Sequence, residues 1–146
     1  MEYKTSHTKT VRALNATVVG TTTLTTSAID TAGADAVRCI VLFGTITDGP
    51  PSIKARQGKQ SNMSDGADLA GTAVAEANTD DNKIAILDIV QPRERYVDFQ
   101  IVRGGATGCV IDGVIVELYY TRTSPVTQDA TVAAYEKWQS PEEGTA

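Results

Sequence analysis

The sequence has one histidine, two cysteines and one tryptophan among its 146 residues. Most transition-metal sites in proteins need several histidine or cysteine ligands, so we expect neither a metal site nor a cofactor. The net charge of −5 has the wrong sign for binding a nucleic-acid backbone. No stretch reaches the roughly 18 to 20 apolar residues of a membrane span, and the first residues lack the apolar core of a signal peptide. We therefore expect a soluble protein without an export signal that contacts neither membrane nor nucleic acid.

Cys39 and Cys109 are too few to form a disulfide scaffold. Both lie within apolar runs, where cysteine usually behaves as a small hydrophobic residue. The sequence therefore predicts two buried free thiols.

Threonine is frequent, with 20 residues, and valine and isoleucine together outnumber leucine by 24 to 6. Residues branched at Cβ suit pleated sheets and disfavour long helices. The chain is about the size of one average domain. Composition therefore predicts a single all-β domain.

Alternation of apolar and polar residues is clearest over 96–102, where Val97, Phe99 and Ile101 share one face of a predicted strand. In the more apolar run 109–120, Val110 and Val114 are expected on one face of a central strand, together with Val116 and Leu118. The remaining strands are predicted at 11–19, 21–29, 36–43, 52–57, 73–77 and 83–90. About eight short strands at this spacing favour a β-sandwich or jelly roll.

Two connections between the predicted strands carry strong turn residues. The glycine-rich segment 103–108 predicts a hairpin that joins strands 96–102 and 109–120. Asp48-Gly49-Pro50-Pro51 predicts a turn between 36–43 and a partner strand at 52–57.

The two ends of the chain differ from its middle. Residues 1–10 are polar and 123–146 contain Pro125 and Pro141, so we interpret them as extended arms that flank a β domain over 11–122. Asp129 is a candidate N-cap for a short helix over 130–139. A helix of about ten residues is marginal in water and needs a surface to pack on.

Three motifs are better explained by structure than by chemistry. The acidic residues at 65, 68, 80 and 81, with Asn82, lack the spacing of a calcium-binding loop, and solvated turns explain them. Gly104 and Gly105 lack the Gly-Lys-Ser/Thr ending of a phosphate-binding loop. Arg93, Arg95 and Arg103 form a basic cluster that could pair with carboxylates of a neighbouring chain or simply face solvent.

The sequence offers no convincing catalytic group. The only histidine, His7, lies in a polar arm without a nucleophile nearby in the sequence. We therefore predict that the protein is not an enzyme.

The order of several segments resembles a known family. These are Asp30-Thr31-Ala32-Gly33-Ala34-Asp35, Phe43-Gly44-Thr45-Ile46-Thr47-Asp48-Gly49, Asp68-Leu69-Ala70-Gly71-Thr72, Pro92-Arg93-Glu94-Arg95-Tyr96-Val97 and Val110-Ile111-Asp112-Gly113-Val114-Ile115. Over about residues 28–122 the chain resembles jelly-roll decoration (cement) proteins of tailed bacteriophages. The resemblance implies a homotrimer that binds the major capsid protein on the outer surface of the virion, after synthesis in the host cytoplasm, and that stabilises the capsid lattice.

Six residues are predicted to bind partners. Aromatic and arginine side chains dominate many protein interfaces, and an apolar neighbour at helical spacing strengthens such an anchor. The candidates are Tyr3, Arg93, Arg95, Val132, Tyr135 and Trp138.

Two other functions remain open at this point. A head-tail connector or tail-tube subunit could also be a small β protein with flexible ends, and ring symmetry would distinguish it. A carbohydrate-binding module is a weaker alternative, because only 5% of the residues are aromatic.

Overall fold

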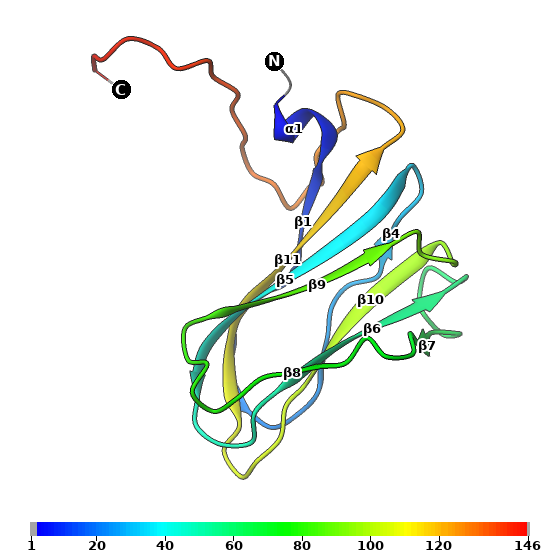
Figure 1. Ribbon diagram of the computed structural model, residues 1–146, viewed down its shortest axis with the longest axis vertical. Helices are drawn as coiled ribbons and strands as arrows, with labels where there is room; N and C mark the ends of the chain where they lie inside the picture. Colours follow the sequence, from blue (N-terminus) through cyan, green and yellow to red (C-terminus); the bar gives the residue numbers. More distant parts are fainter. Residues whose placement is uncertain (1–2, 146) are drawn as a thin grey trace.

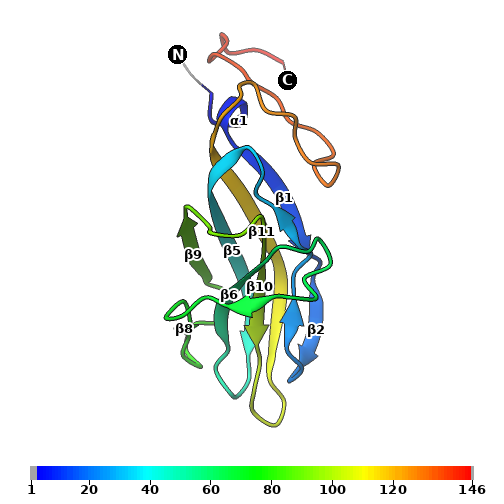
Figure 2. The same cartoon turned by 90° about the vertical axis from the view of Figure 1, so that its right-hand side faces the viewer.

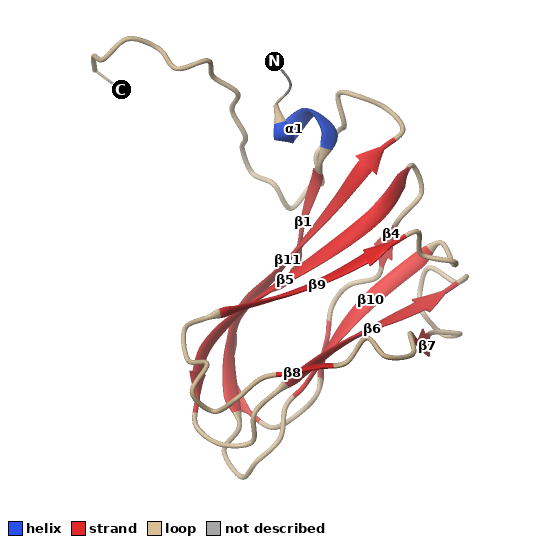
Figure 3. Cartoon of the chain, viewed as in Figure 1, coloured by secondary structure: helices blue, strands red, loops and turns tan. Residues whose placement is uncertain are grey.

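The computed structural model describes residues 3–145 and confirms the all-β prediction. Two antiparallel sheets pack face to face, and a single short helix lies near the N-terminus (Figures 1 and 3). The elements are α1 (Lys4–His7), β1 (Lys9–Leu14), β2 (Thr17–Gly20), β3 (Leu24–Thr25), β4 (Ile29–Asp30), β5 (Ala34–Ile46), β6 (Ser52–Gly58), β7 (Ala67–Asp68), β8 (Val74–Ala75), β9 (Ile84–Val90), β10 (Tyr96–Val102) and β11 (Cys109–Thr121).

Strand order identifies the sandwich as a jelly roll. One sheet, sheet A, has the order β1-β11-β5-β9, and β2 also pairs with β11. The other, sheet B, has the order β3-β10-β6-β7, with β4 on β10 and β8 on β6. If β1 and β2, β3 and β4, and β7 and β8 are each counted as one interrupted strand, the eight strands pair first with eighth, second with seventh, third with sixth and fourth with fifth. This nested pairing is the jelly-roll arrangement. Strands adjacent in sequence lie in opposite sheets, except that β6 is followed by β7 and β8 in the same sheet.

The core lies between the two sheets and follows the predicted alternation. Val97, Phe99 and Ile101 of β10 are fully buried, as are Ile53 and Ala55 of the neighbouring β6. The residues of β5 that face them include Val37, Val41 and Phe43, also buried. Burial of these side chains supplies the main driving force for folding.

A bulge in β11 overturns one prediction. Ile111 and Val114 are both buried, although regular alternation would put an odd-numbered and an even-numbered position on opposite faces of the strand. The register of β11 against β5 shifts between Ile111 and Gly113. Gly113 has a φ of 149°, a value that residues with a Cβ rarely adopt. The extra residue reverses the alternation, so Val110 does not share the face of Val114 as expected.

The predicted hairpin over 103–108 is wrong. β10 lies in sheet B and β11 in sheet A, so this segment crosses between the sheets. The connection from β5 to β6 crosses at the same end of the sandwich, and the expected partner strand at 52–57 pairs with β10 instead of β5. The Asp48 carboxylate joins the two crossings by accepting hydrogen bonds from the N–H groups of Ala106, Thr107 and Gly108, at 3.0, 2.9 and 2.6 Å.

The first part of the chain is less regular than expected. The predicted strands 11–19 and 21–29 are interrupted, and four short strands replace them. Lys9 and Thr10, assigned to the N-terminal arm, belong to β1 and pair with β11.

The short helix expected over 130–139 is absent. Asp129 forms a single turn instead: its carboxylate accepts a hydrogen bond from the N–H of Thr131 at 3.0 Å, and its carbonyl accepts one from Val132 at 2.9 Å. After Val132 the chain is irregular and mostly exposed. An isolated helix of this length is not stable without a surface to pack on, which explains why only the capped first turn forms.

Candidate protein-binding site

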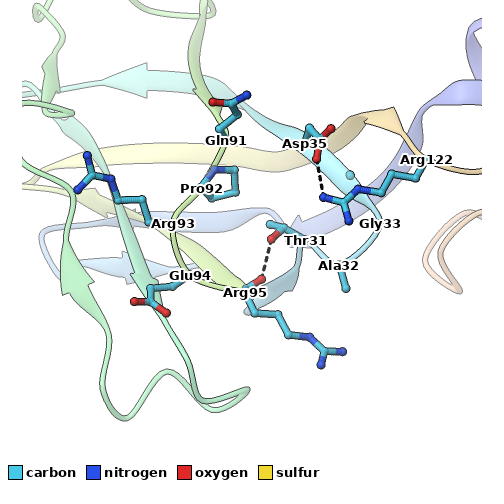
Figure 4. A pocket seen from close by; sticks show the side chains of 11 residues that line it. Thr31, Ala32, Gly33, Asp35, Gln91, Pro92, Arg93, Glu94, Arg95 and Arg122 are labelled. Carbon is cyan, nitrogen blue, oxygen red and sulfur yellow. Dashed lines mark hydrogen bonds and ion pairs between the residues drawn. The ribbon is translucent and has the colours of Figure 1, made fainter.

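A cavity of about 650 Å³ opens at the end of the sandwich that also holds the N-terminal helix (Figure 4). It lies between the connection from β4 to β5, the connection from β9 to β10, and the end of β11. Three of its lining residues are arginines: Arg93, Arg95 and Arg122. We call it the arginine-lined cavity.

The three arginines differ in their partners. Arg95 makes a bidentate ion pair with Asp30, with Nε–Oδ1 and Nη2–Oδ2 distances of 2.9 and 2.8 Å, and this hydrogen bonding lowers the pKa of Asp30. Arg122 donates to Asp35 at 3.0 Å. Within residues 3–145, the guanidinium of Arg93 has neither an ion pair nor a hydrogen bond. Arg93 is therefore the arginine that is available to a carboxylate of a partner.

The C-terminal segment is fixed to the sandwich beside this cavity. Gln128 donates hydrogen bonds to the carbonyls of Thr5 and Thr8, at 3.0 and 2.8 Å, and accepts one from the N–H of Thr10 at 2.9 Å. Thr10 belongs to β1, an edge strand of sheet A. Gln128 therefore satisfies an edge N–H and ties the base of the C-terminal tail to both the helix α1 and the sheet.

Beyond this base, the tail leaves the body (Figures 1 and 2). Val132 is half-buried, whereas Tyr135 is 47% and Trp138 73% exposed. Lys137 Nζ lies 3.4 Å from Ser6 Oγ of α1, so this part of the tail passes the N-terminal helix. Two aromatic side chains are thus held in solvent, away from the core of their own domain.

The outer face of sheet A carries aliphatic side chains from three adjacent strands, exposed on β9 and β11 and half-buried on β5 between them. Ile86 of β9 is paired in register with Ile40 of β5, and Ile40 with Ile115 of β11. Ile84 and Leu42 form a neighbouring pair. We call these five residues the aliphatic patch.

A row of charged residues borders the aliphatic patch. Arg38 lies in register with Asp88 on one side and with Glu117 on the other, and it forms an ion pair with Glu117. Lys4 Nζ lies 2.9 Å from Glu117, and Tyr119 donates to Asp88 at 2.5 Å. The charges on this side of the patch are therefore largely matched within the chain.

The structure brings together only some of the candidate residues. Arg93 and Arg95 line one cavity. Tyr3 is half-buried and precedes α1, at the same end of the molecule, whereas Tyr135 and Trp138 lie on the tail. The predicted cluster with Arg103 is wrong, because Arg103 is buried at the opposite end of β10, where it donates to the carbonyls of Val18, Thr22 and Cys109.

Sequence reasoning missed Arg122 and the aliphatic patch. Arg122 is the second residue after the last predicted strand, and that position is a signal that could have placed it at the sheet end. The run at 83–90 is apolar on both faces, a pattern typical of a fully buried strand, yet β9 is an edge strand with Ile84, Ile86 and Val90 exposed.

The expected acidic turns are present. Asp65 accepts hydrogen bonds from the N–H groups of Lys59 and Gln60, and Asp80 pairs with Lys83 at 2.8 Å.

Over residues 3–145, no three histidine, cysteine, aspartate or glutamate side chains are placed to hold a metal ion. The same residues include no helix with the length and apolarity needed to cross a membrane.

No protein-family model matches the sequence, and no curated protein matches it either. The arginine-lined cavity, the tail and the aliphatic patch are therefore the basis of the function proposed below.

Proposed function

We propose that this protein is a structural component of a tailed-phage virion that binds the outside of the capsid and stabilises its lattice, as a homotrimer. The observation that carries the proposal is the C-terminal tail. Its base is fixed to the sandwich by hydrogen bonds, while Tyr135 and Trp138 project into solvent. Exposed aromatic side chains on an extended segment are suited to anchoring in the groove of a neighbouring subunit.

The arginine-lined cavity supports the same role. It lies at the end of the molecule from which the tail leaves, and Arg93 there is free to pair with a carboxylate of the major capsid protein. Ion pairs of this kind orient a protein on its partner more than they add affinity. The jelly-roll fold agrees with the family that the sequence resembles.

Co-sedimentation with expanded tailed-phage capsids that lack this protein tests the proposal. We expect the wild-type protein to pellet with the capsids and Arg93→Glu to pellet less. Lys83→Glu is the matched control, because it makes the same charge change at an exposed residue before the start of β9, whereas the cavity lies beyond the other end of that strand.

The outcomes separate the candidate functions. Wild-type binding around three-fold positions supports decoration. Failure of the wild-type protein to bind capsids overturns it, and a stable ring of six or twelve copies that ignores capsids favours a connector or tail-tube subunit.

A further inference from the structure

The aliphatic patch is a contiguous apolar surface on the outer face of sheet A. Ile84 and Ile86 are 58% and 50% exposed, and Ile115 is 36% exposed. Their register places Ile86, Ile40 and Ile115 side by side across three strands. Contiguous exposed apolar side chains of this kind mark interaction surfaces more often than isolated ones do.

The patch continues into a depression that the tail has already begun to fill. This depression has a volume of about 260 Å³ and is lined by Leu42, Ile115 and Val132. Gly113 lies opposite Leu42 and has no side chain to fill the space. Val132 therefore contacts the rim of the patch, while the rest of the tail turns away toward α1.

We infer that the aliphatic patch binds the C-terminal tail of a second copy of this chain. Each copy has both a docking surface and the apolar anchors that fit it, and within one copy Tyr135 and Trp138 stay exposed. Docking of each tail on the patch of another copy buries both aromatic side chains. The inference rests on the proposed function, because it names the neighbouring subunit that receives the tail.

The tail docks as the helix that the single chain cannot complete. At about 100° per residue, a helix places Tyr135 and Trp138 within an arc of about 60°, whereas a strand would put them on opposite sides. Val132 stays in the depression of its own copy. The capped turn at Asp129 is its first turn. A ten-residue helix is about 15 Å long, close to the width of three paired strands at about 4.8 Å each.

The charges around the patch and the area that the tail can bury both support the tail as the occupant of the patch. Arg12 extends the row of Ile86, Ile40 and Ile115 onto β1, and its side chain has no ion-pair or hydrogen-bond partner within residues 3–145. Glu136 lies between the two aromatic anchors of the tail and is its natural partner. Two aromatic side chains bury about 300–500 Å². Each copy gives one tail and receives another, so about 600–1,000 Å² of its surface is buried over its two contacts in the assembly.

The exchange is directional, from the tail of one copy to the patch of the next. Such an interface closes only as a ring. A closed ring of any number of copies, including a reciprocal dimer, satisfies every patch and every tail, and the proposed function calls for the ring of three.

A mixing experiment with full-length variants tests the inference without capsids. The patch variant is Ile86→Asp and the tail variant is Tyr135→Ser combined with Trp138→Ser; all three positions are exposed, so the fold should be retained. Val18→Asp is the matched control, because Val18 is 84% exposed on β2, outside the patch. Solution mass is measured by light scattering, and circular dichroism checks folding.

We expect wild type and control to have about three times the 15.5 kDa mass of one chain, and each interface variant alone to be monomeric. An equal mixture of the patch and tail variants should form a one-to-one pair, because it restores one working patch and one working tail. Trp138 is the only tryptophan, so its emission should shift to shorter wavelength as this pair forms.

Three results would overturn the inference: a monomeric wild type, interface variants that keep the wild-type mass, or a mixture that stays monomeric. A monomeric wild type with a shielded Trp138 would mean that the tail docks on its own patch. If wild type assembles by tail exchange but ignores capsids, the exchange stands and the decoration role fails. If wild type is monomeric but decorates capsids, the decoration role stands and the exchange fails.

Discussion

Arg56 and Asp98 form a bidentate ion pair on adjacent strands of sheet B. The Nε–Oδ1 distance is 2.9 Å and the Nη2–Oδ2 distance 2.5 Å, and the Asp98 side chain is only 2% exposed. The two residues are direct partners in the register of β6 and β10. The hydrogen bonds with Asp98 raise the pKa of Arg56. A buried carboxylate in the sheet thus depends on one arginine for its charge compensation.

Replacement of Arg56 by methionine should lower the free energy of unfolding by about 3 kcal/mol, because it leaves the Asp98 carboxylate buried without a counter-charge. Urea unfolding at neutral pH measures the free energy of unfolding of the wild type and the variant. Lys54→Met is the matched control on the same strand: Lys54 pairs with Asp68 at 2.8 Å on the surface, and its loss should cost less than about 1 kcal/mol. Equal effects of the two variants would contradict the expectation.

Arg103→Met should also destabilise the protein, by about 2–3 kcal/mol. The buried guanidinium donates to the carbonyls of Val18, Thr22 and Cys109, and its removal leaves these acceptors without that donor. Thermal unfolding gives the loss. Arg93→Met, at an exposed guanidinium, should change stability by no more than about 0.5 kcal/mol. A neutral Arg103→Met would show that water replaces the guanidinium at no cost.

The acid stability of the protein should depend on Asp48. Hydrogen bonds from the N–H groups of Gly108 and Thr107 lower the pKa of Asp48 below its ordinary value of 3.8. A carboxylate with a lowered folded-state pKa stabilises the fold fully above the ordinary value, and this contribution is lost as the pH falls through the folded-state pKa. The difference in melting temperature between wild type and Asp48→Asn should therefore be constant near neutral pH and shrink below about pH 4.

The control for this measurement is Glu94→Gln, which removes a carboxylate with no hydrogen bond or ion pair in the described part of the chain. It should give no such pH-dependent difference. A gap between Asp48→Asn and wild type that widens in acid would refute the assigned role of Asp48.

Both cysteines should be unreactive in the folded protein. Burial raises the pKa of Cys39 to about 12, and it raises the pKa of Cys109 as well. The thiolate is the reactive species, so a thiol reagent at pH 8 should label neither residue until the protein unfolds. Ser61→Cys, at an exposed loop position, should react at once. Rapid labelling of the unmodified protein would show that the sandwich opens locally.

The positions of β5, β6 and β8 to β11 and the buried face of β10 followed from sequence, because hydrophobic alternation is a local property. Pairing did not. The crossing at 103–108 has the composition of a hairpin, and only the nested arrangement of all the strands sends it to the other sheet. The bulge at Gly113 likewise depends on the register with β5, which no local pattern encodes.

Some residues of the candidate site could be predicted from the sequence, but their arrangement in space could not. The sequence indicated Arg93 and Arg95, but tertiary structure brings in Arg122, which lies 27 residues after Arg95. The burial of Asp98 could not be predicted from the sequence either, because an aspartate on the polar face of an alternating strand normally faces solvent. The role of Val132, Tyr135 and Trp138 as tail anchors stays a prediction, made from their near-helical spacing and from the frequency of aromatic anchors at interfaces.

The pairing of β1 with β11 governs when this protein can fold during synthesis. Lys9 is the register partner of Leu118, so the first strand has no partner for its ladder until the last strand has left the ribosome. At about 5–20 residues per second, the intervening chain takes roughly 5–20 s to make. During that time β1 and the apolar side chains of β5 are exposed on the nascent chain. The nested strand order therefore delays completion of sheet A until β11 has left the ribosome.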